Sequence, residues 1–342
     1  MFTHPEYDGH EAVLHAHDPA TGLKAIVALH STRLGPAFGG CRMYPYAEPA
    51  QALTDALRLA RGMTYKAAIC ELPYGGGKSV ILADPRRDKS PKLLRAMGQV
   101  IEGLGGRYIT ADDVGTTLAD LAVMREVTKH TAGATAAAQE PLAVTAYGVL
   151  MAIEAAVRHY YQRSEFTGLR FAVQGLGNVG YPLCEHLHAR GAALVVSDVD
   201  PARTAKAASE LQAEVAGAEA IYGETADVFA PCALGAVLND RTVPMLRVRL
   251  VCGAANNQLA EWRHDTLLAE RGIAFVPDYL ANAGGVIDFH QEAIDDRPEA
   301  VLASVERVRD ITADLLARAA VTGETPLQVA DRIVRDRIRA PG

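Results

Sequence analysis

Two glycine-rich stretches of the sequence contain residues that could do chemistry. The first, "LPYGGGKSVIL" at residues 72–82, places three glycines directly before Lys78 and Ser79. A phosphate-binding P-loop has the pattern G-x-x-x-x-G-K-[ST] between a strand and a helix. Here Leu72 takes the place of its first glycine, and a strand-like run follows Lys78 instead of a helix. The stretch is therefore not typical of a phosphate site, and we expect its glycines to let the backbone approach a ligand beside Lys78.

The second stretch, "VQGLGNVG", has the spacing G-x-G-x-x-G. It follows an apolar strand and opens an amphipathic helix, and the next strand ends in Asp198. Together these features are typical of a dinucleotide-binding βαβ unit, in which the pyrophosphate lies at a helix N-terminus. A plain βαβ crossover with a glycine turn is the alternative, and the coincidence of the features disfavours it. The predicted cofactor-binding loop consists of Gly175, Gly177, Asn178, Val179 and Gly180.

Asp198 also bears on the choice of cofactor. A carboxylate at this strand end accepts hydrogen bonds from the ribose hydroxyls and repels a 2′-phosphate. Asp200 adds a second negative charge, and no arginine stands immediately beside the two aspartates, although Arg203 is close. We therefore predict that the protein uses NAD in preference to NADP.

The elements around the first stretch predict an α/β domain. Residues 11–30 contain two apolar runs separated by the turn-like "DPATG", which is typical of a β-hairpin. Residues 48–69 have a helical apolar period, and residues 79–83 are typical of a short buried strand. Ser90, followed by proline, would begin another helix. We predict that this domain covers residues 1–138 and has a mixed, mostly parallel sheet.

The elements after residue 138 predict a second domain. A long helix beginning near residue 145 leads into strands that alternate with helices. Such alternation indicates a parallel sheet with helices on both faces. We predict a doubly wound Rossmann sheet over residues 139–342, with the option that the terminal helix packs back on the first domain. A cleft between the two domains is the default place for a ligand.

Composition excludes several classes of partner. The net charge is −7 and there is no block rich in Lys and Arg, which argues against nucleic acid or an anionic membrane. The five cysteines are scattered and form no C-x-x-C pair, so they are typical of buried thiols in a reducing cytosol rather than of disulfides or a metal site. The first residues lack the pattern of a signal peptide, and no apolar run approaches the ~20 residues of a membrane span. We expect a cytoplasmic protein without a metal.

Eight segments of the chain carry a resemblance to a known family. They are, in order, "HSTRLGPAFGGCRMYPY", "RGMTYKAAI", "LPYGGGKSVI", "RYITADDVGTT", "VQGLGNVG", "APCALGAVLND", "GAANNQL" and "PDYLANAGGVI". Together they resemble the glutamate/leucine/phenylalanine/valine dehydrogenase family, in its shorter branch of leucine- and phenylalanine-type enzymes. The resemblance implies a reversible, NAD-dependent oxidative deamination of an L-amino acid to a 2-oxo acid and ammonia. It also implies a homo-oligomer, either a dimer or an octamer.

The resemblance assigns catalytic roles in the first domain. Lys66 matches the lysine that binds the substrate carboxylate, Lys78 the general base, and Asp113 the aspartate that handles the protons of the amino group. An ordinary lysine, with a pKa of ~10.4, is a poor base at neutral pH. Burial and a cationic neighbour, for which Lys66 is the candidate, would lower that pKa. Each lysine could instead be a solvated surface charge, and Asp113 could be a turn residue with Asp112 as its rival.

The resemblance also assigns residues that contact the substrate and the cofactor. In the second half, "GAANN" follows a strand at its C-terminal end, where ligands bind in open α/β sheets, so Asn256 and Asn257 are candidates to hold the carboxamide or the substrate, although asparagines here could equally form a turn. Where the family often has P-S-P-x-T, this chain has "EPLAVT", which keeps Thr145 as a nicotinamide contact but changes the loop. The remaining assigned residues are the substrate-side Gly39 and Gly40, and Ala233 on the cofactor side.

The side-chain pocket is implied to have an apolar lining. Its residues would be Phe38, Ala111, Val286 and Phe289, and none of them could pair with a γ-carboxylate, which disfavours glutamate. If the two phenylalanines point inward, a branched aliphatic substrate is favoured, and if they splay apart, an aromatic one. We predict the branched-chain preference, with phenylalanine as the alternative.

Two other functions remain as remoter alternatives. A 2-hydroxyacid dehydrogenase would need a histidine with a carboxylate partner as its acid and base, and the eleven histidines show no such placement in a glycine-rich stretch. A catalytically inactive NAD-binding regulator would be expected to have lost one of the two lysines. Both lysines are present.

Overall fold

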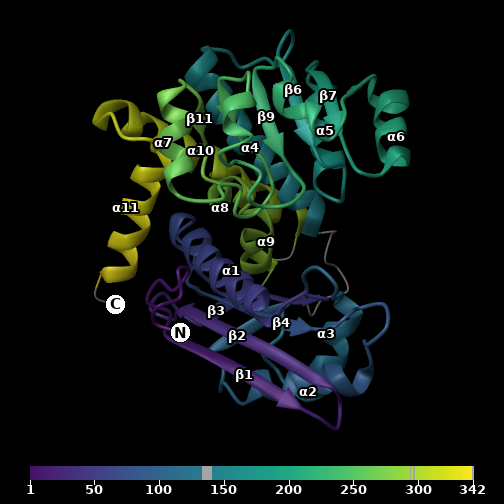
Figure 1. Ribbon diagram of the computed structural model, residues 1–342. Helices are drawn as coiled ribbons and strands as arrows, with labels where there is room; N and C mark the ends of the chain where they lie inside the picture. The colour runs from purple at the N-terminus through teal and green to yellow at the C-terminus, as the bar shows by residue number, and fades with distance from the viewer. Residues whose placement is uncertain (133–140, 293, 296, 341–342) are drawn as a thin grey trace. The chain divides into compact units, whose positions relative to one another are not determined.

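The computed structural model describes residues 1–132, 141–292, 294–295 and 297–340 (Figure 1). The chain divides into unit 1, Met1–Ala137 with Asp336–Gly342, and unit 2, Ala138–Arg335. The domain boundary predicted at residues 138 and 139 lies outside the described residues.

Unit 1 is built on a five-stranded sheet in the order β1-β2-β4-β3-β5. The predicted hairpin is confirmed, since β1 and β2 pair in antiparallel fashion. β2 is also antiparallel to β4, whereas β3 runs parallel to both β4 and β5. The sheet is therefore mixed, as predicted, but half of its pairings are antiparallel because the hairpin is joined to the edge of β4. Its elements are β1 (Ala12–Asp18), β2 (Leu23–Ser31), β3 (Ala37–Tyr44), α1 (Pro49–Ile69), β4 (Gly75–Leu82), α2 (Pro91–Glu102), β5 (Tyr108–Ala111) and α3 (Leu118–Arg125).

Side-chain alternation divides this sheet into two faces with separate cores. On β2, the odd-numbered residues 23–29 pack with α2 and α3, whereas residues 26 and 28 pack with α1. Figure 1 shows α1 on one side of the strands and α2 on the other. On β4, Ile81 belongs to the first core and Val80 to the second. Each side chain of β3 and β4 is thereby assigned to one face.

Two helices of unit 1, α1 and α2, begin where the sequence predicts, whereas α3 was not predicted. The side chain of Ser90 accepts a hydrogen bond from the Leu93 N–H, and Pro91 is the first residue of α2. α3 begins with a capping box, in which Thr117 and Asp120 each satisfy a backbone N–H of the other. α1 also begins with a proline and ends at Ile69. These residues fix where the helices that flank the sheet begin.

Unit 2 contains a six-stranded sheet in the order β8-β7-β6-β9-β10-β11, with all pairings parallel. Numbered from β6, this is the 3-2-1-4-5-6 order of a Rossmann fold, so the predicted fold is confirmed. The direction of winding reverses between β6 and β9, which is where such folds bind ligands. The elements of the unit are α4 (Pro141–Tyr161), β6 (Arg170–Gln174), α5 (Gly180–Ala189), β7 (Ala193–Ser197), α6 (Pro201–Leu211), β8 (Glu214–Val215), η1 (Ala220–Gly223), β9 (Val228–Pro231), η2 (Val243–Met245), β10 (Leu250–Val251), α7 (Arg263–Glu270), β11 (Ala274–Phe275), α8 (Asp278–Ala281), α9 (Gly284–Glu292), α10 (Pro298–Thr322) and α11 (Pro326–Arg339).

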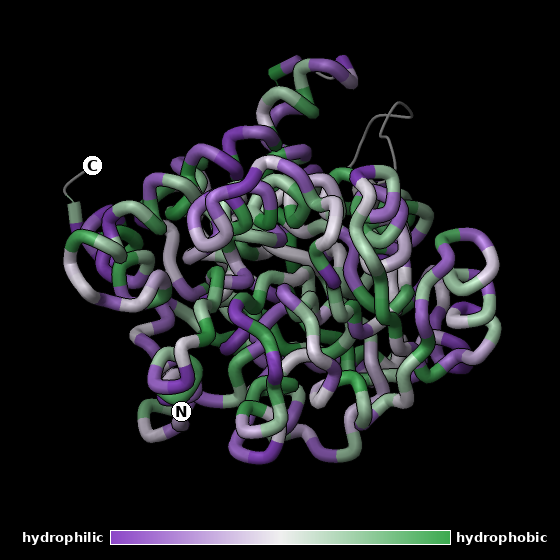
Figure 2. Tube along the Cα trace, turned by 90° about the horizontal axis from the view of Figure 1, so that it is seen from above, coloured by the Kyte–Doolittle hydropathy of each residue, from purple (hydrophilic) through white to green (hydrophobic). Residues whose placement is uncertain are grey.

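The peripheral helices are amphipathic. Hydrophilic and hydrophobic residues alternate along their turns (Figure 2). Within the described part of the chain, every helix is too short or too polar to span a lipid bilayer.

The end of α11 groups with unit 1. There the guanidinium of Arg337 donates to the backbone oxygens of Ala68, at 2.5 Å, and Ile69, at 3.1 Å, and pairs with Glu71. An arginine at this place satisfies carbonyl groups that the end of α1 leaves without helical partners.

Candidate active site and cofactor site

Strand alternation puts the predicted base on the face of the sheet that α1 covers. Val80 of β4 packs against α1, so Lys78 lies on the same face. Cys41 and Met43 of β3 belong to the opposite core, which leaves Arg42 on the α1 face as well. Lys78 is only 4% exposed. The alternative of a solvated surface lysine is therefore wrong for this residue.

Asp113 is the ion-pair partner of Lys78. Lys78 Nζ lies 3.1 Å from Asp113 Oδ1, and Arg42 Nε donates to Asp113 Oδ2 at 2.7 Å. Each oxygen of the carboxylate thus faces a different cation. Sequence reasoning missed Arg42, and the available signal was its position two residues after Gly40 in a segment that carries the resemblance.

Gly40 makes room for this pair. A Cβ on Gly40 would lie 2.8 Å from Asp113 Cβ and 3.2 Å from Lys78 Nζ. A Cβ on Gly39 would lie 1.9 Å from the backbone oxygen of Gly77. Larger residues would push β3 away from its neighbours, so both glycines are needed to assemble the site. Their contact with a substrate stays a prediction.

Burial and neighbouring charges set the protonation of the pair. Burial lowers the pKa of Lys78 from its usual value, Asp113 opposes that shift, and Arg42 adds to it. Burial would raise the pKa of Asp113, but the charges of Lys78 and Arg42 outweigh it and hold that pKa below the usual range. The sequence indicates Lys66 as the cation that lowers the pKa of Lys78. In the structure the cation with this effect is Arg42.

The loop after β5 distinguishes the two neighbouring aspartates. Asp113 is partly buried against its two cations, whereas Asp112 is exposed. The hydroxyl of Thr116 holds the loop, since it donates to Cys41 O at 2.7 Å and accepts from the Asp113 N–H at 3.0 Å. The geometry therefore places Asp113, and not Asp112, beside the lysine.

The glycines before Lys78 let β4 pack closely against its neighbours, and their expected approach to a ligand stays a prediction. β4 begins at Gly75, four residues before the predicted strand, so all three glycines lie inside the sheet. A Cβ on Gly75 would lie 1.8 Å from Ser31 O, and one on Gly76 would lie 2.0 Å from Thr64 N of α1. These close approaches are to protein atoms. The glycines let β4 pack tightly between a strand and a helix. This packing is by itself a reason for residues without side chains at these positions.

The other predicted substrate residues are divided between the two units. In unit 1, Lys66 lies half-buried on α1, and Ala111 is the last residue of β5. Phe38 is buried on β3, with its ring 5.7 Å from that of Tyr74. In unit 2, Val286 is buried and Phe289 half-buried on α9. The two phenylalanines are thus on separate units.

The glycine-rich loop of unit 2 lies at the switch point of the Rossmann sheet. A Cβ on Gly175 would lie 2.7 Å from Ala233 Cβ, which places the loop after β6 beside the loop after β9. A Cβ on Gly180 would lie 1.9 Å from Gly175 O, so the third glycine allows α5 to pack closely on the turn. At Gly177 a Cβ would meet only the guanidinium of Arg203, at 3.8 Å. Of the three glycines, Gly177 thus has the open space that a pyrophosphate requires, so the loop fits a dinucleotide.

The rest of the predicted loop leads into α5. Asn178 is exposed, and Val179 immediately precedes the helix. Both lie beside the helix N-terminus, where backbone N–H groups and the helix dipole favour an anion.

Asp198 is bound to the same loop. Its carboxylate accepts the Leu176 N–H at 2.6 Å and the Asp200 N–H at 2.8 Å. Arg203 Nη1 lies 3.8 Å from Asp198 Oδ2, and Arg203 Nε lies 3.6 Å from Asp200 Oδ2. The nearby arginine noticed in the sequence is therefore in contact with both acids, and a 2′-phosphate would meet charges of both signs.

This arrangement makes a testable prediction about cofactor preference. Replacing Asp198 by Ser removes the charge that repels a 2′-phosphate and leaves Arg203 to bind it. We expect the ratio of kcat/KM for NADP to that for NAD to rise at least about tenfold, because placing a 2′-phosphate beside a carboxylate costs more than ~1.4 kcal/mol. Steady-state kinetics with both cofactors would measure the ratio.

Two further variants separate charge from shape. Asp198→Asn keeps an acceptor for the Leu176 N–H and should show a similar gain. Adding Arg203→Ala to Asp198→Ser should remove most of it. An unmodified protein that uses the two cofactors equally well would show that the assignment of Asp198 is wrong.

The predicted asparagines follow β10 and have different surroundings. Asn257 has a left-handed backbone with φ of 51°, and its backbone carbonyl oxygen accepts the Ala236 N–H at 2.7 Å, as in a turn-forming residue. Asn256 is exposed, and its side-chain oxygen accepts from Asn282 Nδ2 at 2.9 Å. Asn282 was not predicted, although it lies in the segment "PDYLANAGGVI". It also donates to Ala254 O at 2.9 Å and so holds the loop that carries Asn256.

Thr145 lies in the first turns of α4, close to the start of α9. A Cβ on Gly285 would lie 3.2 Å from the Thr145 hydroxyl oxygen. The backbone of the unusual Leu142 and Ala143 is helical, as part of α4, and Glu140 of the same segment lies outside the described residues. The role of Thr145 toward nicotinamide stays a prediction.

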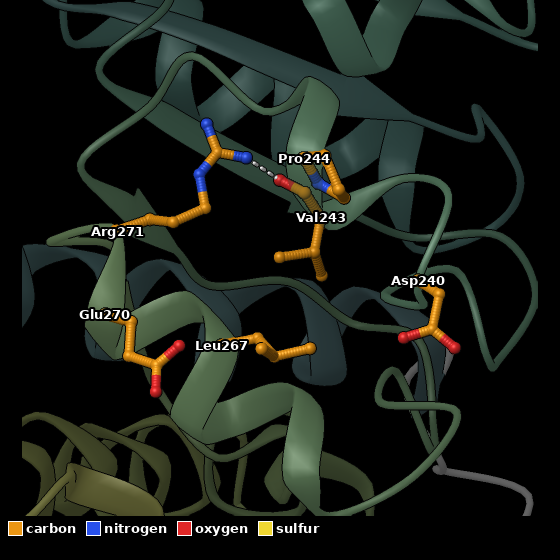
Figure 3. Close-up of a pocket in the computed structure, with 6 residues that line it drawn as sticks. All are labelled: Asp240, Val243, Pro244, Leu267, Glu270 and Arg271. Atoms are coloured by element: carbon orange, nitrogen blue, oxygen red, sulfur yellow. Dashed lines mark hydrogen bonds between the residues drawn. The ribbon is translucent and has the colours of Figure 1, made fainter.

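A surface pocket of unit 2 contains none of the predicted residues. Figure 3 shows Val243 and Leu267 facing each other, with Asp240 and Glu270 on opposite sides. Asp240 also forms, with Glu261 and His264, the group of side chains among the described residues whose ligand atoms could hold a metal ion. However, Arg263 already pairs with both acids, at 2.5 Å and 3.0 Å. The group is therefore an ion-pair network, and the absence of a catalytic metal stays a prediction.

The fold and these two groups of residues define the class of protein. A Rossmann unit with a dinucleotide loop accompanies a unit that buries a Lys–Asp pair, as in nucleotide-dependent dehydrogenases. The family model described as the Glu/Leu/Phe/Val dehydrogenase dimerisation domain matches residues 10–130. The Glutamate/Leucine/Phenylalanine/Valine dehydrogenase model matches residues 139–202 and 201–309. The chain therefore belongs to this family of amino-acid dehydrogenases, which act on CH–NH2 groups, and the predicted resemblance is confirmed.

Relatives of three kinds show a similar degree of identity. Leucine dehydrogenase of Bacillus cereus is 44% identical over 341 residues, which cover 99% of this chain and 93% of the relative. Phenylalanine dehydrogenase of Bacillus thermotolerans is 42% identical over 342 residues, which cover 97% and 89%. The crystal structure of L-tryptophan dehydrogenase from Nostoc punctiforme superimposes with a TM-score of 0.81 at 43% identity and covers 96% of each chain. Overall identity therefore does not distinguish the substrates.

Proposed function

We propose that the protein catalyses the reversible, NAD-dependent oxidative deamination of an apolar L-amino acid, preferably a branched-chain one. The observation that carries this proposal is the buried Lys78–Asp113 pair, with 3.1 Å between Nζ and Oδ1. A buried amine of lowered pKa is suited to take a proton from water, and a neighbouring carboxylate is suited to accept protons from an amine. The family relationship supports the same reaction.

The residues divide the reaction between them. NAD, when bound, accepts the hydride from the substrate Cα. Lys66 pairs with the substrate carboxylate and orients the amino acid. Lys78 takes a proton from the water that attacks the iminium carbon, and the C–N bond of the resulting carbinolamine then breaks. Asp113 takes up a proton from the amino group and returns one as ammonia leaves.

The substrate class follows from the lining of the side-chain pocket. Phe38 is buried against Tyr74, so its ring reduces the depth that a substrate could reach from unit 1. Shallow apolar pockets favour leucine, isoleucine or valine over phenylalanine, although one methylene is worth only about 1–3 kcal/mol of discrimination. Relatives named for phenylalanine and tryptophan make an aromatic substrate the second candidate.

Phe38→Ala should shift this preference. Removing the ring deepens the pocket, so we expect kcat/KM for phenylalanine relative to leucine to rise by about 10- to 200-fold. Initial rates with the two amino acids would measure the ratio. Phe2→Ala, at a phenylalanine that is 83% exposed, is the matched control and should leave the ratio unchanged. A ratio that stays the same in Phe38→Ala would place the specificity elsewhere.

The proposed reaction is tested by NADH formation at alkaline pH over a panel of L-amino acids and 2-hydroxy acids. We expect turnover with branched-chain amino acids and release of ammonia in equal amounts. Turnover of 2-hydroxy acids alone would favour the alternative dehydrogenase, and NAD binding without turnover would favour a regulator. Glutamate as the best substrate would contradict the apolar pocket.

We also propose NAD as the cofactor, a cytoplasmic location and a homo-oligomer, either a dimer or an octamer. Asp198 supports the choice of NAD, and the cysteine pattern supports a reducing compartment. The description of the model that matches residues 10–130 as a dimerisation domain supports an oligomer.

A further inference from the structure

A chain of alternating charges extends behind the catalytic pair. It runs from Lys78 through Asp113 and Arg42 to Asp55 and Tyr46, and all five residues belong to unit 1. Arg42 Nη1 donates to Asp55 Oδ2 at 2.7 Å, and the Tyr46 hydroxyl donates to the same oxygen. Asp55 lies on α1 and Tyr46 in the segment that precedes it. The catalytic pair is thereby connected to the helix that covers this face of the sheet.

Arg42 uses the geometry of its guanidinium to connect two acids. Its Nε bonds Asp113 and its Nη1 bonds Asp55, each at 2.7 Å. The planar fork has donors in fixed directions, so binding Asp55 determines where Nε points. A lysine would supply the charge, but its single nitrogen could not bond both acids in these fixed directions. Arg42 and Asp113 are each 19% exposed at the side chain, so solvent screens this contact far less than it screens a surface ion pair.

We propose that Arg42 is a positioning residue: held by Asp55 and Tyr46, it fixes the carboxylate of Asp113 against Lys78. The proposal rests on the proposed function, because it takes Lys78 and Asp113 as the catalytic groups. It assigns no contact with the substrate to Arg42, Asp55 or Tyr46. Their effect on the reaction is exerted through Asp113.

The charges of these five residues also predict a different shift in the pKa of Lys78 for each variant. With Lys78 protonated, two cations balance two carboxylates. Arg42 lowers the pKa of Lys78, and Asp55 raises it. Removing the charge of Arg42 should therefore make Lys78 hold its proton more strongly, and removing that of Asp55 should make Lys78 lose it more readily.

Titratable groups on the neighbouring elements also bear on the protonation of Lys78 and Asp113. Burial raises the pKa of Tyr46, and its hydrogen bond to Asp55 adds to that shift, so Tyr46 remains a donor. Burial likewise raises the pKa of the Cys41 thiol, which stays neutral. On β2, which also pairs with β4, His30 is directed toward Thr64 and Asp8. The remaining acid on the loop after β5 is Asp112, whose carboxyl is exposed but still partly desolvated, and this desolvation and the charge of Asp113 raise its pKa.

The test compares charge with geometry in the full-length protein. Arg42→Lys keeps the charge and loses the fork, so kcat should fall about 10- to 100-fold with little change in the KM for the amino acid. Its pH profile of kcat/KM should stay where it is. In Arg42→Gln the ionisation of the base should move to higher pH, and in Asp55→Asn to lower pH. Tyr46→Phe, which removes one donor to Asp55, should lower kcat by about threefold.

Controls separate this effect from loss of fold and from failure of the proposed function. Arg95→Gln and Glu126→Gln break an Arg–carboxylate pair of the same unit that also has a 2.7 Å contact but is about half exposed, and both should leave kcat unchanged. Thermal unfolding and NADH binding check that each variant is folded. An unmodified protein without amino-acid turnover would refute the proposed function. If that protein is active, and Arg42→Lys keeps its kcat while Asp55→Asn keeps its pH profile, the positioning role is refuted.

Discussion

Lys78→Ala should lose about 10²- to 10⁴-fold in kcat, which is the usual contribution of a general base. Lys78 is buried and paired with Asp113. In its neutral form the amine of Lys78 can take a proton from water. Because its pKa is lowered, kcat/KM for oxidation should rise with pH and level off below the pH at which free lysine titrates. Alanine should abolish that ionisation. Stopped-flow and steady-state kinetics over a range of pH would measure both effects.

Two lysine variants serve as comparisons for Lys78→Ala. Lys66→Ala should chiefly raise the KM for the amino acid, because a bond to the substrate carboxylate exists in the ground state as well as in the transition state. Lys92→Ala changes an exposed lysine on α2 and should have no effect. Small amines should partly restore Lys78→Ala but not Lys66→Ala. Near-normal turnover of a folded Lys78→Ala protein would show that the base lies elsewhere.

Asp113→Asn should also lose at least about 100-fold in kcat, whereas Asp112→Asn should stay within about threefold of the unmodified protein. The amide has nearly the shape of the carboxylate but cannot take up a proton, and it leaves Lys78 and Arg42 without their shared anion. Asp112 is more exposed than Asp113, so solvent screens its charge more, although partial burial still raises its pKa. Single-turnover kinetics would show whether the loss lies in the chemical step.

Stability is the necessary control for Asp113→Asn. Losing the anion that Lys78 shares with Arg42 leaves Lys78 buried without its ion-pair partner and destabilises the fold, so unfolding in urea should be measured for both aspartate variants. Asp113→Glu retains the charge and should be more stable than Asp113→Asn. The assignment of Asp113, rather than Asp112, to the reaction is refuted if Asp112→Asn loses more activity than Asp113→Asn while both proteins are folded.

The cofactor unit was the part most fully predictable from the sequence. The strand, the three glycines, the helix and Asp198 are consecutive, so their spacing alone indicates how they meet in space. The structure adds the contacts of Asp198 with the Leu176 N–H and with Arg203. Those contacts arise across two turns that carry no separate signal.

The catalytic unit was less predictable. β3 contains Gly39 and Gly40 and was not recognised as a strand, because paired glycines weaken strand propensity. Likewise, β4 starts at Gly75, inside a run that is typical of a loop. In both places, close packing by neighbouring elements outweighs local preference, and that packing is not a property of the segment itself.

Short segments of the sequence are enough to identify the family, the Rossmann unit, and Lys78 and Asp113 as separate catalytic candidates. The bond from Arg42 to an aspartate 71 positions away, and its link to Asp55, became visible in the folded chain alone. The reason is the strand order β4-β3-β5, which puts three distant segments side by side. Strand order depends on which surfaces pack best over the whole unit, and no local pattern specifies it.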